Sequence, residues 1–449
     1  MPSSPTAVSA PGKVLLAGGY LVLDRQYTGL VFGLSARINV IAQEIQTIQG
    51  VQLSEIIVES PQFLEAQWRY GYHLAPGNGG IKLTQLQVGS TQMNANPFVE
   101  ITLAYALTYI IAAAHLPPSH TFAPVQLTVL ADNDYYSHAA AASSHRFAKF
   151  PTKLKDAHKT GLGSSAALVT ALAAALLTHY LPRAAFDLGT DAGKRALHNL
   201  AQAAHCAAQG KVGSGFDVAA AVYGSCVYRR FSPSVLSGLP EAGAPGFAPA
   251  LAECVLGSAW DTEVAKESAA RMPPGVALRM CDVDCGSQTV GMVKQVLRWR
   301  EADAAASRAL WDELQARNEA LGAVLSSSSS GGGGGGDDEI APAVARVREL
   351  VRRMGEASGV PVEPASQTAL LDALAREVDG VYEGVVPGAG GFDALALLVR
   401  DDEATETRIK KFLEGWSQEK GGSVRLLDVK GEMEGVRREG LEQYNGWLA

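Results

Sequence analysis

A glycine- and serine-rich segment in the first half of the chain has the residue types that bind phosphate. It reads Lys159-Thr160-Gly161-Leu162-Gly163-Ser164-Ser165-Ala166. Alanine and leucine dominate residues 165–180, which predicts a helix that opens directly from this segment. Backbone N–H groups and the helix N-terminus can then face phosphate oxygens, and Ser164 or Ser165 can ligate Mg²⁺. A serine-capped helix that binds nothing is the alternative, and a lysine placed before the glycines argues against an ordinary P-loop.

Two charged residues and two further glycine turns could complete such a site. Lys13 begins an apolar strand, where a cation can point into a cleft, and Asp217 follows the glycine turn 213–215 among small and apolar residues. The turn 388–391 leads into a strand expected over 395–399. Singly, these features fit a surface lysine, a helix-capping aspartate and a sharp turn. Together with the paired serines they supply the parts that phosphoryl transfer needs.

The composition favours a globular protein that acts on small molecules. The chain has 449 residues, 47% of them hydrophobic, and a formal net charge of -8, which gives no electrostatic reason to bind nucleic acid or anionic membranes. Its five cysteines form no CxxC pairs, so neither a zinc site nor a disulfide framework is predicted. The apolar stretch 98–116 contains Glu100 and several alanines, which favours a packed helix over a membrane span. Without a secretory signal pattern in residues 1–10, we expect a cytoplasmic protein.

The elements that must position these residues fall into two groups. Strands are expected over 14–23 and 30–42, and a helix over 194–209 that ends at Gly210. Beyond about residue 270 the pattern changes to a strand over 276–283, a long helix over 289–324, two more helices, a strand and a helix. The sequence therefore predicts an N-terminal lobe, 1–270, and a C-terminal lobe, 271–449. A serine- and glycine-rich stretch, 326–338, is expected to be a flexible linker within the second lobe.

The lysine strand, the glycine-serine loop and the late glycine turn occur in the order of the three motifs of the GHMP kinases, and the chain resembles this family over most of its length. Three flanking segments are similar to those of the fungal-type phosphomevalonate kinases, namely 19–24 (GYLVLD), 198–202 (HNLAQ) and 213–221 (GSGFDVAAA). The resemblance implies an α+β fold of two lobes. The first would carry the glycine-serine phosphate loop, and the second would be a ferredoxin-like lobe that completes the substrate cleft.

The resemblance also implies a reaction and roles for individual residues. ATP would phosphorylate 5-phosphomevalonate to 5-diphosphomevalonate, a step of the mevalonate route to isoprenoids and sterols, with Mg²⁺ as the cation. Lys13 and Asp217 would occupy the transfer site, and Ser165 would face Mg²⁺. The remaining residues would bind ATP (Lys159, Gly161, Leu162, Gly163, Ser164, Ser165 and Ala166) or the acceptor (Tyr20, Ser214, Arg229, Arg230, Gly388, Ala389 and Gly390).

Physical reasoning modifies some of these implied roles. A phosphate acceptor with a second pKa of about 6 is already mostly dianionic at neutral pH, so Asp217 is expected to orient Lys13 or a metal more than to act as a general base. Two polyanions meeting at one point need extra positive charge, which makes Arg230, together with Arg229, a candidate clamp for the acceptor phosphate. A solvated basic pair is the alternative.

One departure from the family pattern concerns the metal. Mevalonate kinases carry a glutamate on the helix before the aspartate loop as a second Mg²⁺ ligand, whereas residues 203–209 here contain no carboxylate. His205 in this stretch is expected to be a packed helix residue. Another GHMP enzyme, such as mevalonate kinase, and a non-catalytic GHMP protein that senses metabolites are the competing functions. The sequence leaves the oligomeric state open.

Overall fold

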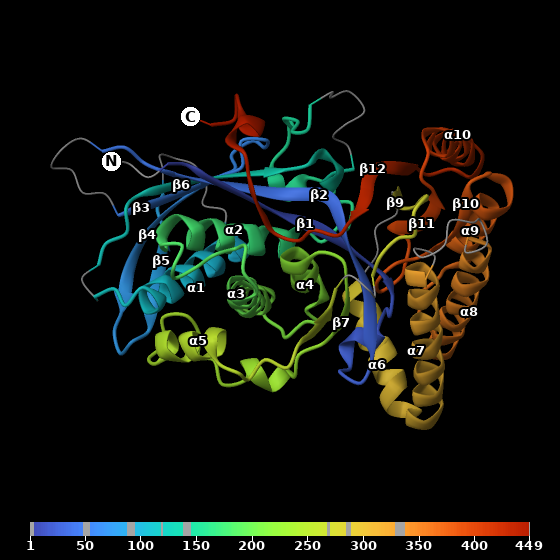
Figure 1. The fold of residues 1–449 in the computed structure, drawn as a ribbon, viewed down its shortest axis with the longest axis horizontal. Helices are drawn as coiled ribbons and strands as arrows, with labels where there is room; N and C mark the ends of the chain where they lie inside the picture. Colours follow the sequence, from blue (N-terminus) through green and yellow to red (C-terminus); the bar gives the residue numbers. More distant parts are fainter. Residues whose placement is uncertain are drawn as a thin grey trace.

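The computed structural model describes residues 4–47, 54–87, 95–117, 120–137, 145–266, 270–283, 289–327 and 337–448. Among these residues, thirteen strands form one continuous sheet that runs through both lobes. In Figure 1 the sheet spans the molecule, with the first lobe in blue and green and the second lobe in yellow and red. The chain is therefore an α+β protein of two lobes that share a sheet.

The first lobe is organised around two long neighbouring strands. Antiparallel β1 (Thr6–Ala17) and β2 (Thr28–Glu44) pair along most of their length. On the edge of β2 away from β1, one end of the strand pairs with β6 (Val125–Ala131), and the sheet continues through β3 (Glu55–Glu59), β4 (Gln67–Ala75) and β5 (Gly80–Gln85). The other end of β2 pairs along the same edge with β7 (Cys226–Arg229), which in turn pairs with β8 (Glu263–Ala265). Most residues of β2 are buried, which fits its branched apolar side chains. The predicted strands 14–23 and 30–42 correspond to these two strands, although Leu21–Leu23 forms a 3₁₀ turn.

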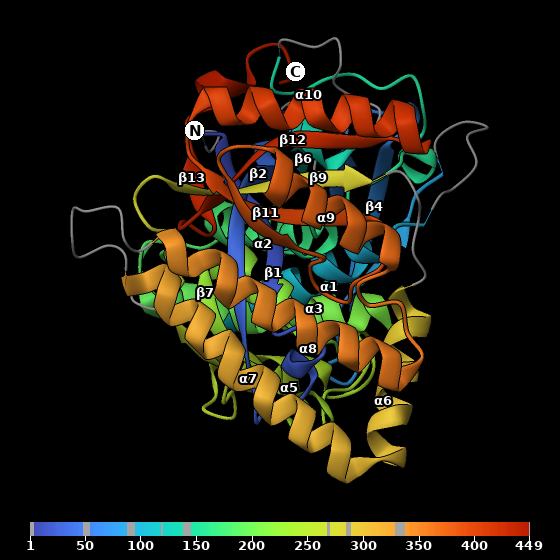
Figure 2. The same ribbon diagram turned by 90° about the vertical axis from the view of Figure 1, so that its right-hand side faces the viewer.

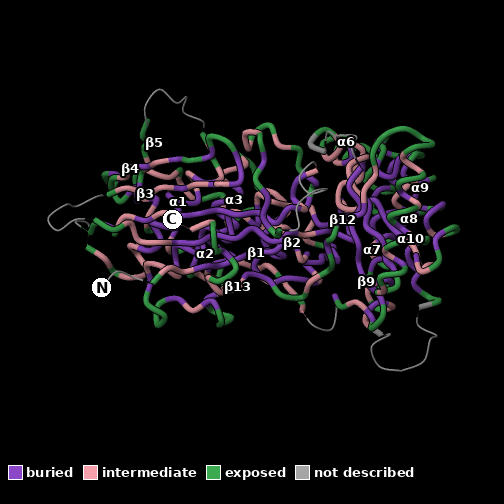
Figure 3. The backbone as a smooth tube through the Cα atoms, turned by 90° about the horizontal axis from the view of Figure 1, so that it is seen from above, coloured by how far each residue is buried: buried purple, intermediate pink, exposed green. Residues whose placement is uncertain are grey.

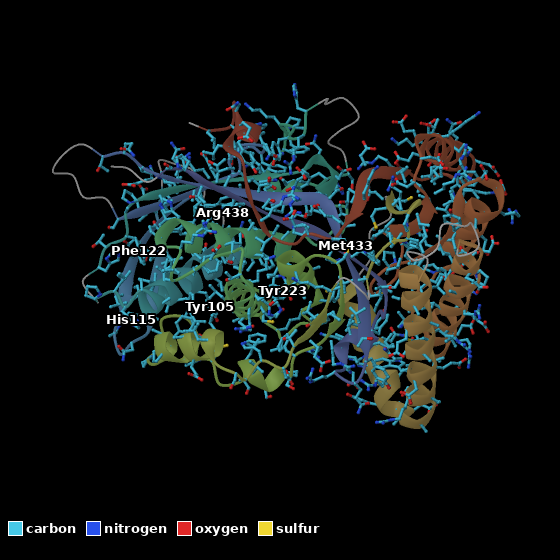
Figure 4. The ribbon with its side chains drawn as sticks, in the orientation of Figure 1. Tyr105, His115, Phe122, Tyr223, Met433 and Arg438 are labelled. Carbon is cyan, nitrogen blue, oxygen red and sulfur yellow. The ribbon has the colours of Figure 1, made fainter. Side chains whose placement is uncertain are left out.

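Helices cover one face of this part of the sheet. They are α1 (Pro97–Ala113), α2 (Ser164–Tyr180), α3 (Asp191–Gln209), α4 (Phe216–Tyr223) and α5 (Phe247–Leu256). Tyr105 of α1 meets Phe247 of α5 edge to face, with ring centroids 5.0 Å apart, inside this helical layer (Figure 4). The predicted helices over 165–180 and 194–209 are confirmed. The apolar stretch 98–116 is the packed helix α1, and no helix in the described residues has the length and hydrophobicity needed to cross a membrane.

The second lobe has the ferredoxin-like arrangement. Its strands are β9 (Val276–Val283), β10 (Val381–Val385), β11 (Ala394–Arg400) and β12 (Val424–Glu432), all antiparallel in the order β10-β11-β9-β12. The helices α6 (Thr289–Ala302), α7 (Ala304–Ser327), α8 (Ile340–Ser358) and α9 (Ala365–Glu377) lie between β9 and β10, and α10 (Glu403–Lys420) lies between β11 and β12. Figure 2 shows α7 and α8 packed side by side along the edge of this lobe.

The structure corrects one predicted helix and locates the linker. The expected helix over 289–324 is two helices, because the Asp303 carboxylate accepts a hydrogen bond from Ala306 N at 3.3 Å and so caps the start of α7. Of the predicted linker, Ser326 and Ser327 belong to α7 and Asp337 begins a 3₁₀ turn. Residues 328–336 lie outside the described residues.

The end of the chain ties the two lobes together. β12 pairs with β9 in the second lobe and then with β2 in the first, and β13 (Arg437–Glu439) pairs with β1. The buried Arg37 of β2 donates to the carbonyl of Gly435 and pairs with Glu432, which anchors this returning segment. Figure 3 shows that backbone in the interior of both lobes is buried. The division near residue 270 falls between β8 and β9 and stays a prediction.

Candidate active site

A cavity of about 600 Å³ lies between the two lobes. The first lobe lines it with residues of β1, the turn after β1, the glycine-serine loop, α3 and the segment 211–217, and the second lobe contributes α6 and the late glycine turn. The charged groups on its wall are Lys13, Lys211, Asp217, Arg230, Lys294 and Asp393. The cavity thus brings the three glycine segments, Lys13 and Asp217 together, as the sequence predicts.

Lys13 is bound to the glycine-serine loop through both its main chain and its side chain. Lys13 N donates to the carbonyl of Leu162 at 2.8 Å, and Nζ donates to the carbonyl of Gly161 at 3.4 Å. Gly163 has a φ of 82°, and a Cβ there would lie 2.9 Å from Lys13 Cε, so glycine lets the lysine side chain pass along the loop. Burial lowers the pKa of Lys13, an effect that the nearby Asp217 charge partly opposes.

The serine and the aspartate face a common histidine. Ser165 Oγ at the start of α2 lies 3.1 Å from His205 Nε2, and Asp217 Oδ2 lies 4.0 Å from the same nitrogen. The other oxygen of Asp217 accepts a hydrogen bond from Val218 N at 2.9 Å, which holds the carboxylate at the N-terminus of α4. His205 on α3 is only 2% exposed, so the prediction that it is packed is confirmed, but its ring also forms part of the cavity wall.

The late glycine turn closes the cavity from the second lobe. Gly388 N donates to the carbonyl of Leu15 at 3.1 Å, and the Tyr20 hydroxyl donates to the carbonyl of Ala389 at 2.7 Å. A Cβ at Gly19 would lie 2.1 Å from the Gly388 carbonyl oxygen, so only glycine permits this approach. Tyr20 adopts a φ of 65°, which is uncommon for a residue with a side chain. Gly388, Ala389, Gly390 and Ser214 all line the cavity.

The two candidate arginines point to different surroundings. Arg229 does not line the cavity: its guanidinium contacts Glu263 at 3.0 Å and the carbonyls of Arg25 and Gln26. Because successive side chains of a strand point to opposite faces, only one of two adjacent arginines at the end of β7 can reach the cavity. The structure therefore contradicts the pairing of Arg229 with Arg230 in one clamp.

Arg230 lines the cavity, but most of its guanidinium is occupied by the backbone. It donates to the carbonyls of Leu23 at 2.5 Å, Val212 at 3.1 Å and Gly213 at 2.8 Å. Desolvation lowers the pKa of Arg230, and its buried Nε has no hydrogen-bond partner. Arg230 therefore braces the segment that leads to Asp217, and its contact with an acceptor stays a prediction.

Replacement of Arg230 tests this brace. We expect Arg230→Lys and Arg230→Ala to lower the free energy of unfolding by similar amounts, because an ammonium group cannot replace a guanidinium that donates to three carbonyls. Each loss should be about 1–3 kcal/mol in the free energy of unfolding, measured by urea denaturation. A higher acceptor KM in Arg230→Ala with unchanged stability would instead support the phosphate clamp.

The predicted ATP-binding residues lie in and around the glycine-serine loop. Gly161 lines the cavity, whereas Leu162 is buried with 1% exposure and contributes its carbonyl to Lys13. Lys159 is exposed and lies outside the cavity wall. Gly163, Ser164, Ser165 and Ala166 form the turn and first residues of α2 beside the cavity. Their nucleotide contacts stay predictions.

Several cavity residues were missed by the sequence reasoning. Lys211 lies two residues before the glycine turn 213–215, and Asp393 lies two residues after the turn 388–391, so proximity to those motifs was an available signal. Lys294 on α6 had no such signal, because only the packing of the second lobe brings α6 to the cavity. His205 carried no sequence signal of its own, because its spacing is that of the other residues on the buried face of α3.

Comparison with known proteins shows the family. The model of the GHMP kinases N terminal domain matches residues 147–225. Phosphomevalonate kinase ERG8 of Gibberella zeae is 64% identical over 98% of both chains, and phosphomevalonate kinase erg8 of Aspergillus fumigatus is 45% identical over 100% of this chain and 99% of its own.

Solved structures share the fold at much lower identity. The phosphomevalonate kinase of Streptococcus pneumoniae in complex with phosphomevalonate and AMPPNP superimposes with a TM-score of 0.60 at 16% identity, covering 95% of this chain and 99% of its own. Lin0012 of Listeria innocua gives a TM-score of 0.66 at 17% identity, covering 97% and 99%. With three motifs around one cavity, this fold and full-length fungal relatives, the chain belongs to the phosphomevalonate kinase family of the GHMP kinases.

Proposed function

We propose that this protein transfers the γ-phosphoryl group of ATP to the phosphate of 5-phosphomevalonate, giving ADP and 5-diphosphomevalonate. The observation that carries the proposal is the inter-lobe cavity, where Lys13, the glycine-serine loop and Asp217 converge in a member of this kinase family. A cavity closed by elements of both lobes can hold two substrates in line for transfer.

The charge of the cavity supports two anionic substrates. Its wall carries Lys13, Lys211, Arg230 and Lys294 against the carboxylates of Asp217 and Asp393, whereas the whole chain has a net charge of -8. Each unit-charge repulsion at about 4 Å costs roughly 4 kcal/mol at an effective dielectric of about 20. The excess of cations in the cavity offsets part of this repulsion when two phosphorylated molecules meet.

The residues of the site fit Mg²⁺ held mainly by substrate phosphates. In the part of the chain that the structure describes, no three His, Cys, Asp or Glu side chains gather as a metal site. Mg²⁺ in kinases is commonly held by one or two protein oxygens together with phosphates and water, and Ser165 and Asp217 supply such oxygens here. When bound, the ion would neutralise developing charge on the transferred phosphoryl group.

The protein side chains perform separate parts of the transfer in this proposal. The glycine-serine loop and the N-terminus of α2 bind the ATP phosphates through backbone N–H groups. Lys13, fixed to that loop, stabilises negative charge at the transfer point. Asp217 stands beside Lys13 and His205 and orients them, because the acceptor phosphate needs little help to lose its proton.

Two lysines on opposite lobes are proposed to bind the acceptor phosphate. Lys211 and Lys294 are exposed and line the cavity, and the ammonium group of neither makes an ion pair or hydrogen bond with another described residue. We expect Lys211→Ala and Lys294→Ala each to raise the KM for 5-phosphomevalonate about tenfold, since each removes a charge-assisted contact. Steady-state kinetics should show the KM for ATP nearly unchanged.

A lysine remote from the cavity provides the control. Lys82 on β5 is likewise exposed, so Lys82→Ala changes the net charge by the same amount without altering the cavity. An acceptor KM that rises equally in Lys82→Ala would mean a general charge effect. An unchanged acceptor KM in both cavity variants would remove these lysines from the site.

The first experiment is an ADP-release assay with purified protein, Mg-ATP and one of three conditions: 5-phosphomevalonate, mevalonate or no acceptor. Turnover only with 5-phosphomevalonate is the expected result, because an acceptor without phosphate leaves the lysines unpaired. A preference for mevalonate would instead indicate mevalonate kinase activity. No turnover with tight ATP binding would indicate a non-catalytic sensor.

The cellular location is also part of the proposal. In the described residues, Cys206, Cys226, Cys254 and Cys281 are free thiols, as expected in a reducing compartment. We propose that the protein acts in the cytoplasm. Fluorescence microscopy of the tagged full-length chain would show diffuse cytoplasmic signal, and punctate signal would contradict this location.

A further inference from the structure

His205 occupies the junction between the phosphate loop and the aspartate segment. It lies on α3, is 2% exposed, and presents Nε2 to three polar groups from different places in the chain. Ser165 Oγ is at 3.1 Å, the Gln209 side-chain nitrogen at 3.2 Å and Asp217 Oδ2 at 4.0 Å. The imidazole also packs against Phe98 of α1, with ring centroids 5.8 Å apart. Its position is therefore fixed by packing as well as by polar contacts.

The partners of Nε2 define its hydrogen-bonding role. An amide nitrogen can only donate, so the Gln209 side chain, oriented as in the structure, requires a lone pair on Nε2. The imidazole tautomer that fits this contact carries its hydrogen on Nδ1, and the single lone pair of Nε2 is shared by the Gln209 and Ser165 donors. A serine hydroxyl has one hydrogen and two lone pairs. When that hydrogen points to His205, the lone pairs of Ser165 are left for another partner.

We propose that His205 is a positioning residue that accepts the hydroxyl hydrogen of Ser165 and thereby directs the serine lone pairs toward the metal bound with the nucleotide. This inference rests on the proposed role of Ser165 as a Mg²⁺ ligand. Side chains that orient a ligand commonly change metal affinity 10- to 100-fold when they are removed. His205 touches neither the acceptor nor the transferred phosphoryl group in this role.

The contact between His205 and Ser165 also offers a substitute for the glutamate that mevalonate kinases carry on the corresponding helix. Residues 203–209 contain no carboxylate, so α3 adds no negative ligand for a cation. Instead, α3 contributes a neutral acceptor that acts on the serine of α2. The metal site is then controlled by the orientation of Ser165 rather than by an additional charge.

Mn²⁺ binding tests the proposal without requiring turnover. Free Mn²⁺ is measured by electron paramagnetic resonance with the full chain and AMPPNP, for wild type, His205→Leu, His205→Gln and His205→Asn. A glutamine amide reaches the position of Nε2, whereas asparagine is one methylene shorter. We expect Mn²⁺ affinity to fall at least tenfold in His205→Leu and His205→Asn and to return to within about threefold of wild type in His205→Gln.

The serine variant shows whether the effect passes through Ser165. In a Ser165→Ala background, His205→Leu should cause no further loss of Mn²⁺ affinity, since the hydroxyl that it orients is gone. Additive losses, equal affinities of His205→Gln and His205→Asn, or wild-type affinity in Ser165→Ala would overturn the proposal. If His205→Leu does not fold, as judged by circular dichroism, the Gln and Asn pair decides.

The binding experiment separates this inference from the proposed reaction. It contains no acceptor, so a protein that fails to phosphorylate 5-phosphomevalonate can still show the predicted pattern of Mn²⁺ affinities. Conversely, normal turnover of wild type together with unchanged Mn²⁺ affinity in His205→Asn would leave the reaction intact and reject the role of His205.

Discussion

Replacement of Lys13 by methionine is expected to lower kcat about 1,000-fold in the ADP-release assay with 5-phosphomevalonate. Lys13 donates to the glycine-serine loop, with Nζ 3.4 Å from the Gly161 carbonyl, and it lines the cavity in which we propose that the two anionic substrates meet. Loss of one favourable unit-charge interaction of roughly 4 kcal/mol corresponds to about three orders of magnitude in rate. Residual activity above about one tenth of wild type would exclude Lys13 from the transfer point.

The stability of the same variant provides an independent check. Burial lowers the pKa of Lys13 below its ordinary value of 10.5, so the folded state disfavours the charged form. The buried charge therefore lowers the stability of the folded protein. This destabilisation is fully present below the folded-state pKa and disappears as the pH rises toward 10.5. At pH 7, Lys13→Met should therefore unfold at a temperature no lower than wild type. Differential scanning calorimetry measures this, and a large decrease would show that the kinetic loss reflects misfolding.

Asp217→Asn is expected to lower kcat about 100-fold or more while leaving the shape of the acidic side of the pH–rate profile unchanged. In the proposed mechanism the Asp217 carboxylate orients Lys13 at the transfer point, and loss of such an electrostatic element typically costs two to three orders of magnitude. The fall in activity at low pH should remain, because it reports protonation of the acceptor phosphate, whose second pKa is about 6. The kcat/KM profile between pH 5 and 9 measures both effects.

A carboxylate far from the cavity provides the comparison. Asp428 on β12 is exposed and pairs with Lys410 at the surface, so Asp428→Asn should have wild-type kinetics and the same pH profile. If the acidic limb vanished only in Asp217→Asn, Asp217 would be a general base, and the orienting role would be wrong.

The local elements of this protein could be predicted because their signals are contained in short segments. The helix expected over 165–180 is α2, Ser164–Tyr180, and the strand expected over 276–283 is β9. Alanine and leucine stabilise the helix wherever it packs, and the preceding Gly163 has the positive φ that the turn requires. Glycine segments likewise marked the three turns that reach the cavity. The single helix expected over 289–324 is instead two helices, because the Asp303 carboxylate caps the start of the second one.

The assignment of individual side chains to the site required the tertiary structure. Arg229 and Arg230 are neighbours in the sequence, yet the Arg229 guanidinium contacts Glu263 and Arg230 lines the cavity. Strand alternation separates the two side chains, but only the packing around β7 decides which of them faces the cavity. The hydrogen bonds from the Arg230 guanidinium to the carbonyls of Leu23, Val212 and Gly213 depend on how these segments pack around it. No local sequence pattern specifies that packing.

The sequence by itself determined the chemistry of the motifs, the two-lobed fold and the family, since these depend on residue identity and order along the chain. The packing of the two lobes brings Lys294 of the second lobe to the same cavity as Lys211 of the first, and it places His205 Nε2 3.1 Å from Ser165 Oγ and 4.0 Å from Asp217 Oδ2. Both arrangements bring together segments that are far apart in the chain, through the packing of α3, α6 and the shared sheet. Side-chain proximity of this kind is set by long-range packing, which one sequence does not encode as a local pattern.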